Sequence, residues 1–519
     1  MNSGTSEVRR RNSVAGAVPE GELGWLGGVM WMGNRWVDDL GMLIGRAVLV
    51  AGLAAVLGSG VLAACTSEAE PSASLRWQPC SENAEFDCGT VSVPIDWARP
   101  EGERIDVAVV RDRADGPAEK VGTLVSLPGG PGGSGVDEIL KGGKFSAELR
   151  GRFDIVSIDP RGVKRSHPVQ CDAGLVKYRP VLVPELGGRI DEVHSYARDL
   201  AASCRQYTGT LMDHLDAVSI ARDVEAVRLA LGVNQISTYS RSYGTMPAQA
   251  YAELFPKHLR AMLLDSVDDH SLDGRAFLAS EARAGKDTFG EFAAWCARDT
   301  QCALHGTPAD QVFSDLYAKA ARGELRDPTD AAKSLGAFDL NAQLIQRLYR
   351  PEWSRLATDL RALTDQPAGS PLPPAPAQLQ GKPAPMPEIT VCSDWTFDIA
   401  NQDQWTRLWR EQNDNSAPLR AHFAWGAGSL CSGWPIPPAN PAHRPQIVDG
   451  PPVLIINSLH DPATPHEWAE GVAKNTPNST LLTYEGWGHG IYDRSPCTTT
   501  AADQYLINLT IPQTRCPAA

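Results

Sequence analysis

The chain has 519 residues, of which 42% are apolar and 21% charged, and its formal net charge at pH 7 is −14. This length corresponds to two or three domain-sized units, and the composition can bury a sizeable core, which excludes disorder throughout. The acidic balance argues against a nucleic-acid-binding protein, which needs a basic face for phosphate. Eleven cysteines without a CxxC motif or a Cys/His cluster indicate an oxidising compartment, and we predict no metal and no cofactor.

The segment from Met42 to Cys65 has the features of a lipoprotein signal peptide. Arg46 precedes an apolar stretch over residues 47–64, and the run LAAC at 62–65 resembles a bacterial lipobox. We therefore predict an N-terminal extension and signal peptide over residues 1–64, a lipidated Cys65, and a polar tether over 65–74. The alternative is a single membrane-spanning helix, since eighteen apolar residues are at the margin for crossing a bilayer.

Short, continuous apolar runs recur along the rest of the chain, separated by helical patterns. They begin at residues 123, 153, 235, 259, 452 and 480. Such runs suit strands that are covered on both faces, so the sequence predicts an α/β fold with a mostly parallel central sheet. The helix before residue 235 is well marked, because apolar residues recur at three- and four-residue steps up to Gly232, which suits a C-terminal cap.

The strand signal disappears between residues 271 and 430, where Ala-, Trp- and Arg-rich helical patterns replace it. We predict an inserted helical lid there, with an extended loop over 367–387, a stretch that holds eight prolines in twenty-one residues. The core then consists of two parts, residues 75–270 and 431–519.

Ten cysteines remain when Cys65 is set aside, and an even number in an exported chain argues for disulfides. The simplest pattern is sequential pairing; the alternative is a set of scattered buried thiols. The five expected pairs are Cys80 with Cys88, Cys171 with Cys204, Cys296 with Cys302, Cys392 with Cys431, and Cys497 with Cys516.

The strongest local signal is the run SRSYG at residues 240–244, which lies directly between a predicted strand and a predicted helix. A sharp strand-to-helix turn holds a serine in a strained conformation with its hydroxyl exposed, and small residues on either side let strand and helix approach. Ser242 is therefore the candidate nucleophile. Ser240 stands where the usual pattern has its first glycine.

A serine hydroxyl needs a base, and the base needs an orienting carboxylate. Asp461 follows the apolar run that begins at 452, and His489 follows the next one, between two glycines. Both lie at the carboxyl ends of predicted strands, where open α/β sheets collect their sites. We predict a triad of Ser242, Asp461 and His489, and we interpret His460 as a residue that packs within its loop.

The glycine-rich run LPGGPGGSG at 127–135 directly follows another predicted strand. This is the position of the loop that donates a backbone N–H to a tetrahedral oxyanion. We expect one donor from Gly130, or its neighbour Gly129, and the other from Tyr243. A phosphate-binding loop is the rival interpretation, but the run lacks the Lys and Ser/Thr of a P-loop and the spacing of a dinucleotide fingerprint.

Taken together, these motifs resemble the exported tripeptidyl aminopeptidases, α/β-hydrolase serine peptidases related to proline iminopeptidases. The resemblance rests on PGGPGGSG, FDIVSIDPRGVKRSHPV, SRSYGT, NSLHDPATP and GWGHG in this order, and covers about Leu75 to Cys516. It implies the α/β-hydrolase fold, removal of short peptides from free N-termini, and an exported protein that is secreted or held on the outside of the membrane by a lipid. Besides Ser240, the run LDSVDDH at 264–270 departs from the family pattern and adds a carboxylate.

An aminopeptidase must pair the ammonium of its substrate with carboxylates. We consider Asp268 and Asp269, at the exit of a strand and the entrance of the lid, and also Glu281 and Glu291 within the lid. We expect Asp159 and Arg161 to brace the oxyanion loop or the nucleophile turn through an ion pair.

Two other functions remain open at this point. A carboxylesterase would use the same acyl-transfer machinery, and a noncatalytic binding lipoprotein would not need the three candidate catalytic residues. We expect peptides with a free N-terminus as substrates, no nucleic-acid partner, and contact with a membrane only through the lipid anchor.

Overall fold

The computed structural model describes residues 75–519 except 117, 329, 331–332, 368 and 370–380. The predicted signal peptide, the lipidation site at Cys65 and the tether lie outside the described residues. Within the described part of the chain, no helix has both the length and the apolar character needed to cross a bilayer.

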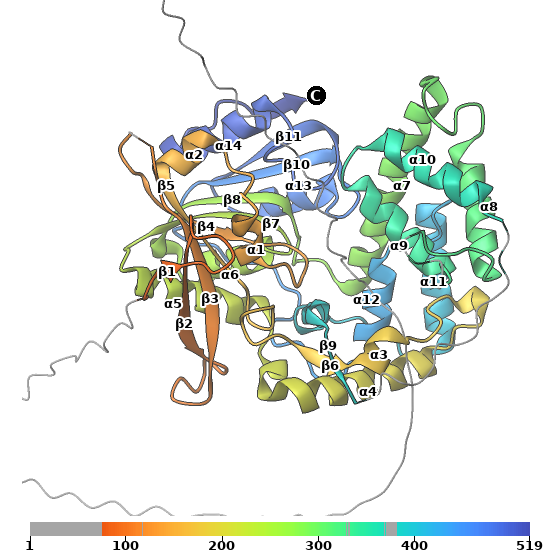
Figure 1. Ribbon diagram of the computed structural model, residues 1–519, viewed down its shortest axis with the longest axis horizontal. Helices are drawn as coiled ribbons and strands as arrows, with labels where there is room; N and C mark the ends of the chain where they lie inside the picture. The colour runs from red at the N-terminus through yellow and green to blue at the C-terminus, as the bar shows by residue number, and fades with distance from the viewer. Residues whose placement is uncertain (1–74, 117, 329, 331–332, 368, 370–380) are drawn as a thin grey trace, which may run out of the picture.

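A ten-stranded sheet forms the centre of the core, in the order β1-β2-β3-β5-β4-β7-β8-β10-β11-β12 (Figure 1). The strands from β5 to β12 in this order are parallel, whereas β1, β2 and β3 pair antiparallel at one side. The mostly parallel sheet of the predicted α/β fold is therefore confirmed. Its strands are β1 (Gln78–Pro79), β2 (Asp87–Pro94), β3 (Arg104–Asp112), β4 (Gly122–Leu127), β5 (Phe153–Ile158), β7 (Ile236–Ser242), β8 (Leu259–Val267), β10 (Val453–His460), β11 (Ser479–Trp487) and β12 (Arg515–Pro517).

Helices cover both faces of this sheet, as parallel strands require. One face packs against α1 (Gly135–Leu140), α2 (Ala147–Arg152) and α14 (Pro496–Asn508), and the other against α5 (Ala217–Leu231), α6 (Thr245–Leu254) and α13 (His466–Asn475). Neighbouring residues of β4 show that the strand is buried on both faces. Leu124 packs in the apolar cluster on the side of α1, α2 and α14, and Val125 packs in the cluster on the side of α5, α6 and α13. This two-sided burial explains the continuous apolar runs in the sequence.

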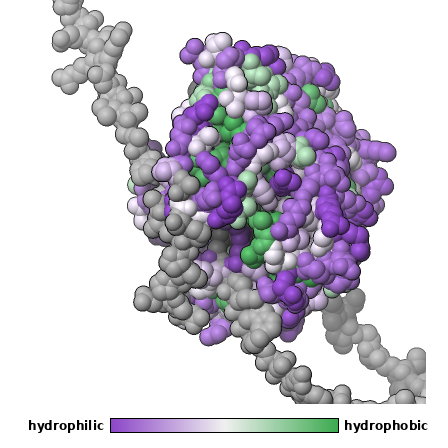
Figure 2. Space-filling view, turned by 90° about the vertical axis from the view of Figure 1, so that its right-hand side faces the viewer, coloured by the Kyte–Doolittle hydropathy of each residue, from purple (hydrophilic) through white to green (hydrophobic). Residues whose placement is uncertain are grey.

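A helical block is inserted between β8 and β10 and lies to one side of the sheet (Figure 1). It has an apolar core of its own. Figure 2 views the molecule from this side and shows a mostly hydrophilic surface with small apolar patches and a hollow near its centre. The block contains α7 (Gly274–Arg298), α8 (Ala309–Ala321), α9 (Ala337–Leu348), α10 (Trp353–Asp365), α11 (Gln402–Ser416) and α12 (Ala424–Cys431).

An earlier segment of the chain completes this block, although the sequence analysis assigned it to the core. It runs through α3 (Ala173–Lys177), η1 (Pro184–Leu186), α4 (Ile190–Thr208) and η2 (Gly209–Asp213). The Trp425 indole on α12 donates a hydrogen bond of 2.6 Å to the carbonyl of Leu182. A two-stranded sheet of β6 (Gln170–Asp172) and β9 (Pro383–Pro385) joins the two segments. The short helix η4 (Pro387–Ser393) follows β9 along the chain. Elsewhere, in the core, η3 (Pro256–His258) directly precedes β8.

The five disulfides follow the predicted sequential pairing. The bonded pairs are Cys80–Cys88, Cys171–Cys204, Cys296–Cys302, Cys392–Cys431 and Cys497–Cys516. Five disulfides indicate that the protein folds in an oxidising compartment.

Candidate active site

Ser242 is the last residue of β7, and its φ of 56° lies in the left-handed region. The Thr245 hydroxyl donates a hydrogen bond of 2.7 Å to the Ser242 carbonyl and so fixes the turn into α6. A Cβ added at Gly244 would lie only 2.5 Å from the carbonyl oxygens of Leu127 and Pro128. Glycine is therefore required at 244, because the turn packs directly against the end of β4.

Ser240, which replaces the usual glycine, is fully buried within β7. It is not among the described residues with a positive φ, and its hydroxyl has no hydrogen-bond partner. The strand therefore accepts a small side chain at this position without backbone strain.

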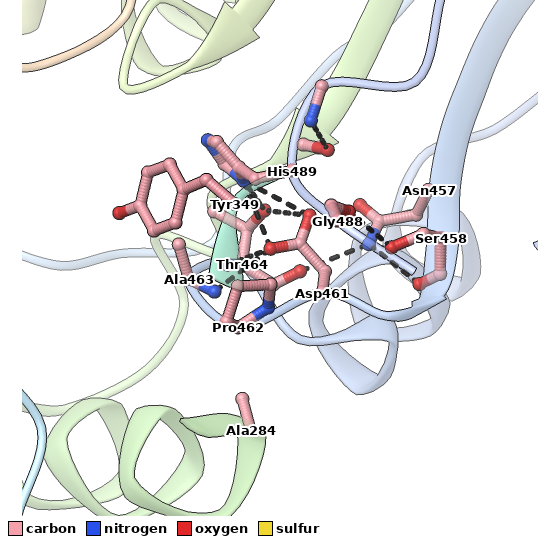
Figure 3. A network of polar contacts seen from close by, with 12 residues as sticks. Ala284, Tyr349, Asn457, Ser458, Asp461, Pro462, Ala463, Thr464, Gly488 and His489 are labelled. Carbon is pink, nitrogen blue, oxygen red and sulfur yellow. Dashed lines mark hydrogen bonds and ion pairs between the residues drawn. The ribbon is translucent and has the colours of Figure 1, made fainter. Parts of the chain in front are cut away.

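Asp461 and His489 come together at the ends of β10 and β11 (Figure 3). His489 Nδ1 lies 3.0 Å from both carboxylate oxygens of Asp461. The Asp461 carboxylate also accepts the backbone N–H groups of Ala463 at 2.9 Å and Thr464 at 3.0 Å, and the Thr464 hydroxyl at 3.1 Å. A buried carboxylate held by three further donors is fixed in place, which suits it to orient an imidazole.

Contacts with the helical block and with β8 hold His489 and the neighbouring Gly490 in place. The carbonyl of Tyr349, at the end of α9, accepts the His489 N–H at 2.9 Å, and the two rings lie 4.7 Å apart between centroids. On the other side, Ser266 Oγ accepts the N–H of Gly490 at 2.9 Å. The Thr464 hydroxyl lies 3.3 Å from His489 Nδ1. Sequence reasoning missed Tyr349, which no local motif links to His489, and it assigned no role to Thr464, although this residue lies in the run NSLHDPATP.

The loop that carries His489 lies against the turn that carries Ser242. A Cβ at Gly490 would come within 2.7 Å of Arg241 Cδ, so the Arg241 side chain packs directly over this glycine. The Ser242 hydroxyl and the His489 ring are not hydrogen-bonded to each other in the structure. Catalytic hydrogen bonds of this kind often tighten only when substrate binds.

The glycine-rich loop passes directly over Ser242. A Cβ at Gly129 would lie 2.9 Å from Ser242 Cβ and 3.5 Å from its Oγ, so the approach depends on the absence of a side chain. Gly130 follows with φ of 128°, and the Gly133 N–H closes the turn onto the Gly129 carbonyl at 3.1 Å. On the other side of the serine, the Tyr243 hydroxyl donates to Asp394 at 2.5 Å.

The expected ion pair between Asp159 and Arg161 is wrong. Asp159 does brace the glycine-rich loop, because its carboxylate accepts the Ser134 hydroxyl and pairs with Arg165 at 3.1 Å. Arg161 turns away and forms a fully buried pair with Asp223 on α5 at 2.6 Å. Asp159 and Arg161 lie on the same loop but contact different parts of the protein. Their closeness in the sequence does not indicate this difference.

Asp268, a candidate for binding the substrate ammonium, directly follows β8. It is buried, and its Oδ2 has no hydrogen-bond partner. Burial raises the pKa of Asp268 well above its ordinary value, and the negative charges of Glu281 and Asp461 raise it further. Glu281, on α7, contacts His422 Nδ1, and burial also raises its pKa.

Asp269 and Glu291 have other partners. Asp269 Oδ1 accepts the N–H of Ser271 at 3.0 Å and its hydroxyl at 2.6 Å, which closes the turn into the helical block. Glu291 accepts the Trp487 indole N–H at 3.0 Å. His460, close to Glu291, pairs with Asp287 of α7 at 2.7 Å, so it joins the core to the block rather than only packing within its own loop.

The serine on a strained turn at a strand end, with an Asp–His pair at the following strand ends, defines a serine hydrolase of the α/β-hydrolase fold. Residues 416–516 match a family model described as TAP-like protein. The chain is 30% identical over 479 residues to serine protease Hip1 of Mycobacterium tuberculosis strain H37Rv, covering 84% of this chain and 89% of that protein. It therefore belongs to the α/β-hydrolase family that contains this protease.

Two further relatives have similar coverage. Tripeptidyl aminopeptidase of Streptomyces lividans is 29% identical over 463 residues, 84% of each chain. Carboxylesterase B of Mycobacterium tuberculosis strain H37Rv is 30% identical over 470 residues, 84% of this chain and 88% of that protein. The resemblance to tripeptidyl aminopeptidases is confirmed, and the family contains both peptidase and esterase names.

Proposed function

We propose that this protein is a serine exopeptidase that removes short peptides, most simply tripeptides, from free N-termini. The observation that carries the proposal is the His489 ring held at Nδ1 by buried Asp461, because this leaves Nε2 as the only ring nitrogen available to Ser242. The relatives named serine protease and tripeptidyl aminopeptidase support a peptide substrate.

The reaction follows from this arrangement. Ser242 Oγ attacks the scissile carbonyl carbon while His489 Nε2 takes the hydroxyl proton, and Asp461 stabilises the imidazolium that results. The backbone N–H groups of Tyr243 and of Gly130, or its neighbour Gly129, receive the oxyanion. His489 then gives its proton to the leaving amine, which leaves the N-terminal peptide as an ester on Ser242 Oγ. Water, deprotonated by His489, attacks this ester, and His489 returns the proton to Ser242 Oγ as the peptide leaves with a free carboxyl group.

Asp268 is the carboxylate that we assign to the substrate ammonium, with Glu281 beside it. Its strongest electrostatic neighbours are carboxylates, and its free Oδ2 lacks a partner. A substrate ammonium pairs with Asp268 in its ionised form, whereas an acetylated N-terminus brings no positive charge to this site. Asp269, which the sequence analysis also considered, accepts two hydrogen bonds from Ser271.

Free and acetylated tripeptidyl naphthylamides test this function, with p-nitrophenyl esters as a comparison. We expect at least a hundredfold preference for the free amine in kcat/KM. Asp268→Asn should raise KM for free amines, and Asp269→Asn should act on the melting temperature instead. Equal cleavage of free and acetylated peptides would rule out the exopeptidase.

A carboxylesterase is the second candidate, favoured by the relative of that name. It would hydrolyse p-nitrophenyl esters efficiently and cleave none of the peptides. A noncatalytic binding lipoprotein would have no reason to hold Asp461 and His489 in their present geometry.

We also propose that Cys65 carries a lipid and anchors the exported protein at the outer side of the membrane. Cys65→Ala should abolish lipid attachment and release the protein into the medium or leave it unprocessed, as fractionation and N-terminal sequencing would show. A variant that stays with membranes and begins upstream of residue 65 would indicate a membrane-spanning anchor instead.

A further inference from the structure

The loop after β11 carries His489 between two glycines, and both have a positive φ, 99° at Gly488 and 74° at Gly490. Glycines restrain the backbone less than other residues do, so the position of the imidazole depends on the hydrogen bonds of this loop. The core supplies some of them: the Gly488 N–H donates to the His460 carbonyl at 3.1 Å, and Ser458 Oγ donates to the Gly488 carbonyl at 2.5 Å. These bonds hold Gly488, whereas other groups bind the backbone of His489 itself.

Arg494 and Tyr349 bind both polar backbone groups of His489. The His489 N–H donates to the Tyr349 carbonyl at 2.9 Å, and the His489 carbonyl accepts from Arg494 Nη2 at 3.3 Å. The same Nη2 also donates to the Tyr349 carbonyl at 2.7 Å, and Arg494 Nε donates to the Gly490 carbonyl at 3.2 Å. His489, Tyr349 and Arg494 therefore form a closed ring of three hydrogen bonds, with a fourth bond to the next residue of the loop.

The ring of hydrogen bonds joins three parts of the chain. A Cβ at Gly488 would lie 2.7 Å from the Tyr349 carbonyl oxygen and 3.2 Å from Arg494 Nη2, so the loop packs closely against both groups. Tyr349 belongs to the helical block, at the end of α9, and Arg494 directly precedes Ser495, the N-cap of α14 in the core. One guanidinium thus connects the histidine loop, residues 488–490, to the helical block and to the core.

The Arg494 side chain is suited to this arrangement. It is half-buried; burial lowers the pKa of Arg494, and the negative charge of Asp493 opposes this shift. Arginine nevertheless stays protonated in proteins, so its donors are present at every working pH. Its rigid fork presents N–H groups in several directions, whereas the ammonium of lysine is a compact point charge on a flexible stem.

We propose that Arg494 is a positioning residue for the histidine of the triad: its guanidinium fixes the loop 488–490 against the end of α9 and so holds the imidazole beside the turn that carries Ser242. The proposal rests on the triad and not on the substrate, because a peptidase and an esterase need the same histidine. A displacement of reacting groups by about 1 Å can lower a rate by about a hundredfold. Without the guanidinium, the loop keeps its bonds to the core, so the protein should fold while the imidazole is no longer held in position.

The test measures kcat and KM of Arg494→Ala and Arg494→Lys on a p-nitrophenyl ester and on a free tripeptidyl naphthylamide. We expect Arg494→Ala to lower kcat by at least about tenfold with little change in KM, because the chemical step and not binding is impaired. The rate at which a fluorophosphonate labels Ser242 should fall by a similar factor. Arg494→Lys keeps the charge but not the fork, and should recover only part of the lost kcat. Guanidinium ions, added to Arg494→Ala at concentrations too low to unfold it, should also restore part of kcat.

Arg260 provides a matched control. It is also half-buried, and its guanidinium donates to two backbone carbonyls, those of Leu506 at 2.6 Å and Ile507 at 2.7 Å. It lies near the start of β8, whereas Ser242 pairs with Val267 at the end of this strand. Arg260→Ala should therefore lower the melting temperature and keep the wild-type kcat.

The outcomes separate this proposal from the function proposed above. Wild-type kcat in Arg494→Ala overturns it, and so does full recovery in Arg494→Lys, because the charge alone would then suffice. An equal loss of kcat in Arg260→Ala also overturns it, since that result would indicate general destabilisation. A loss confined to the peptide substrate overturns it as well, because Arg494 would then act on the substrate and not on His489. If Arg494→Ala does not fold, Arg494→Lys decides: a lower kcat at unchanged KM supports the proposal. Cleavage of the ester alone by the wild type refutes the exopeptidase, and the Arg494 variants are then compared on the ester.

Discussion

Asp461→Asn offers the sharpest test of the catalytic assignment, because the geometry dictates what the amide must do. In the structure one carboxylate oxygen accepts the N–H groups of Ala463 and Thr464, and the other accepts the Thr464 hydroxyl. If the amide oxygen keeps the two backbone donors, the amide nitrogen replaces the second oxygen and points a donor toward His489 Nδ1. The ring proton then moves to Nε2, which can no longer accept a proton from Ser242.

The expected cost is a fall in kcat of about 10⁴-fold, equivalent to about 5.5 kcal/mol in the activation free energy. Since both backbone hydrogen bonds survive, the melting temperature should change by only a few degrees. Initial rates on an ester and on a free tripeptide substrate measure the loss, and a fluorophosphonate that labels reactive serines measures the reactivity of Ser242 directly.

The pair of His460 and Asp287 provides a matched control. These side chains lie 2.7 Å apart, closer than His489 and Asp461, yet their pair links β10 to α7 away from Ser242. Asp287→Asn should therefore keep wild-type kcat. An Asp461→Asn enzyme with more than a tenth of wild-type kcat, or an Asp287→Asn enzyme that loses most of it, would refute the assignment.

Three further results are expected. Ser242→Ala should lower turnover by several powers of ten with an unaltered melting temperature, since only a hydroxyl is lost; residual activity near wild type would exclude Ser242 as the nucleophile. Burial lowers the pKa of His270 to about 4, so the folded state resists its protonation and the unfolding free energy should fall by up to about 3 kcal/mol as pH drops from about 6.5 to 4. His270→Gln should reduce this pH dependence in urea titrations, and an unaltered slope would contradict the reasoning. Removing Cys392 and Cys431 together opens a loop of sequence separation 39 and should cost about 4 kcal/mol of stability, whereas equal urea midpoints would show that the bridge constrains little.

The sequence predicts the parts of this molecule whose signals are local. Continuous apolar runs identify the parallel strands, because each is buried on both faces, and the turn at Ser242 is encoded in adjacent residues. Asp461 and His489 could be placed at strand ends for the same reason. The hairpin of β2 and β3 was missed, because β2 mixes buried and exposed positions and the buried apolar run of β3, residues 107–110, is only four residues long.

Contacts that depend on distant segments left no comparable signal. Arg161 pairs with Asp223, which lies 62 positions further along the chain. The sequence analysis expected a partner close in sequence, Asp159. Tyr349 contacts His489 from the end of α9, a helix of the inserted block. The roles of such residues can be recognised only from the tertiary structure, because their contacts come from segments distant in the sequence.

The order of the disulfides has a consequence for how the chain acquires them. Each bridge joins two cysteines that are consecutive among the ten from Cys80 to Cys516, so no bridged loop encloses or crosses another. If the chain enters an oxidising space from its N-terminus and each bond forms as soon as its second cysteine emerges, at most one of the ten cysteines is unpaired at any moment. The order of emergence would then be enough to give the observed connectivity, without reshuffling of wrong pairs.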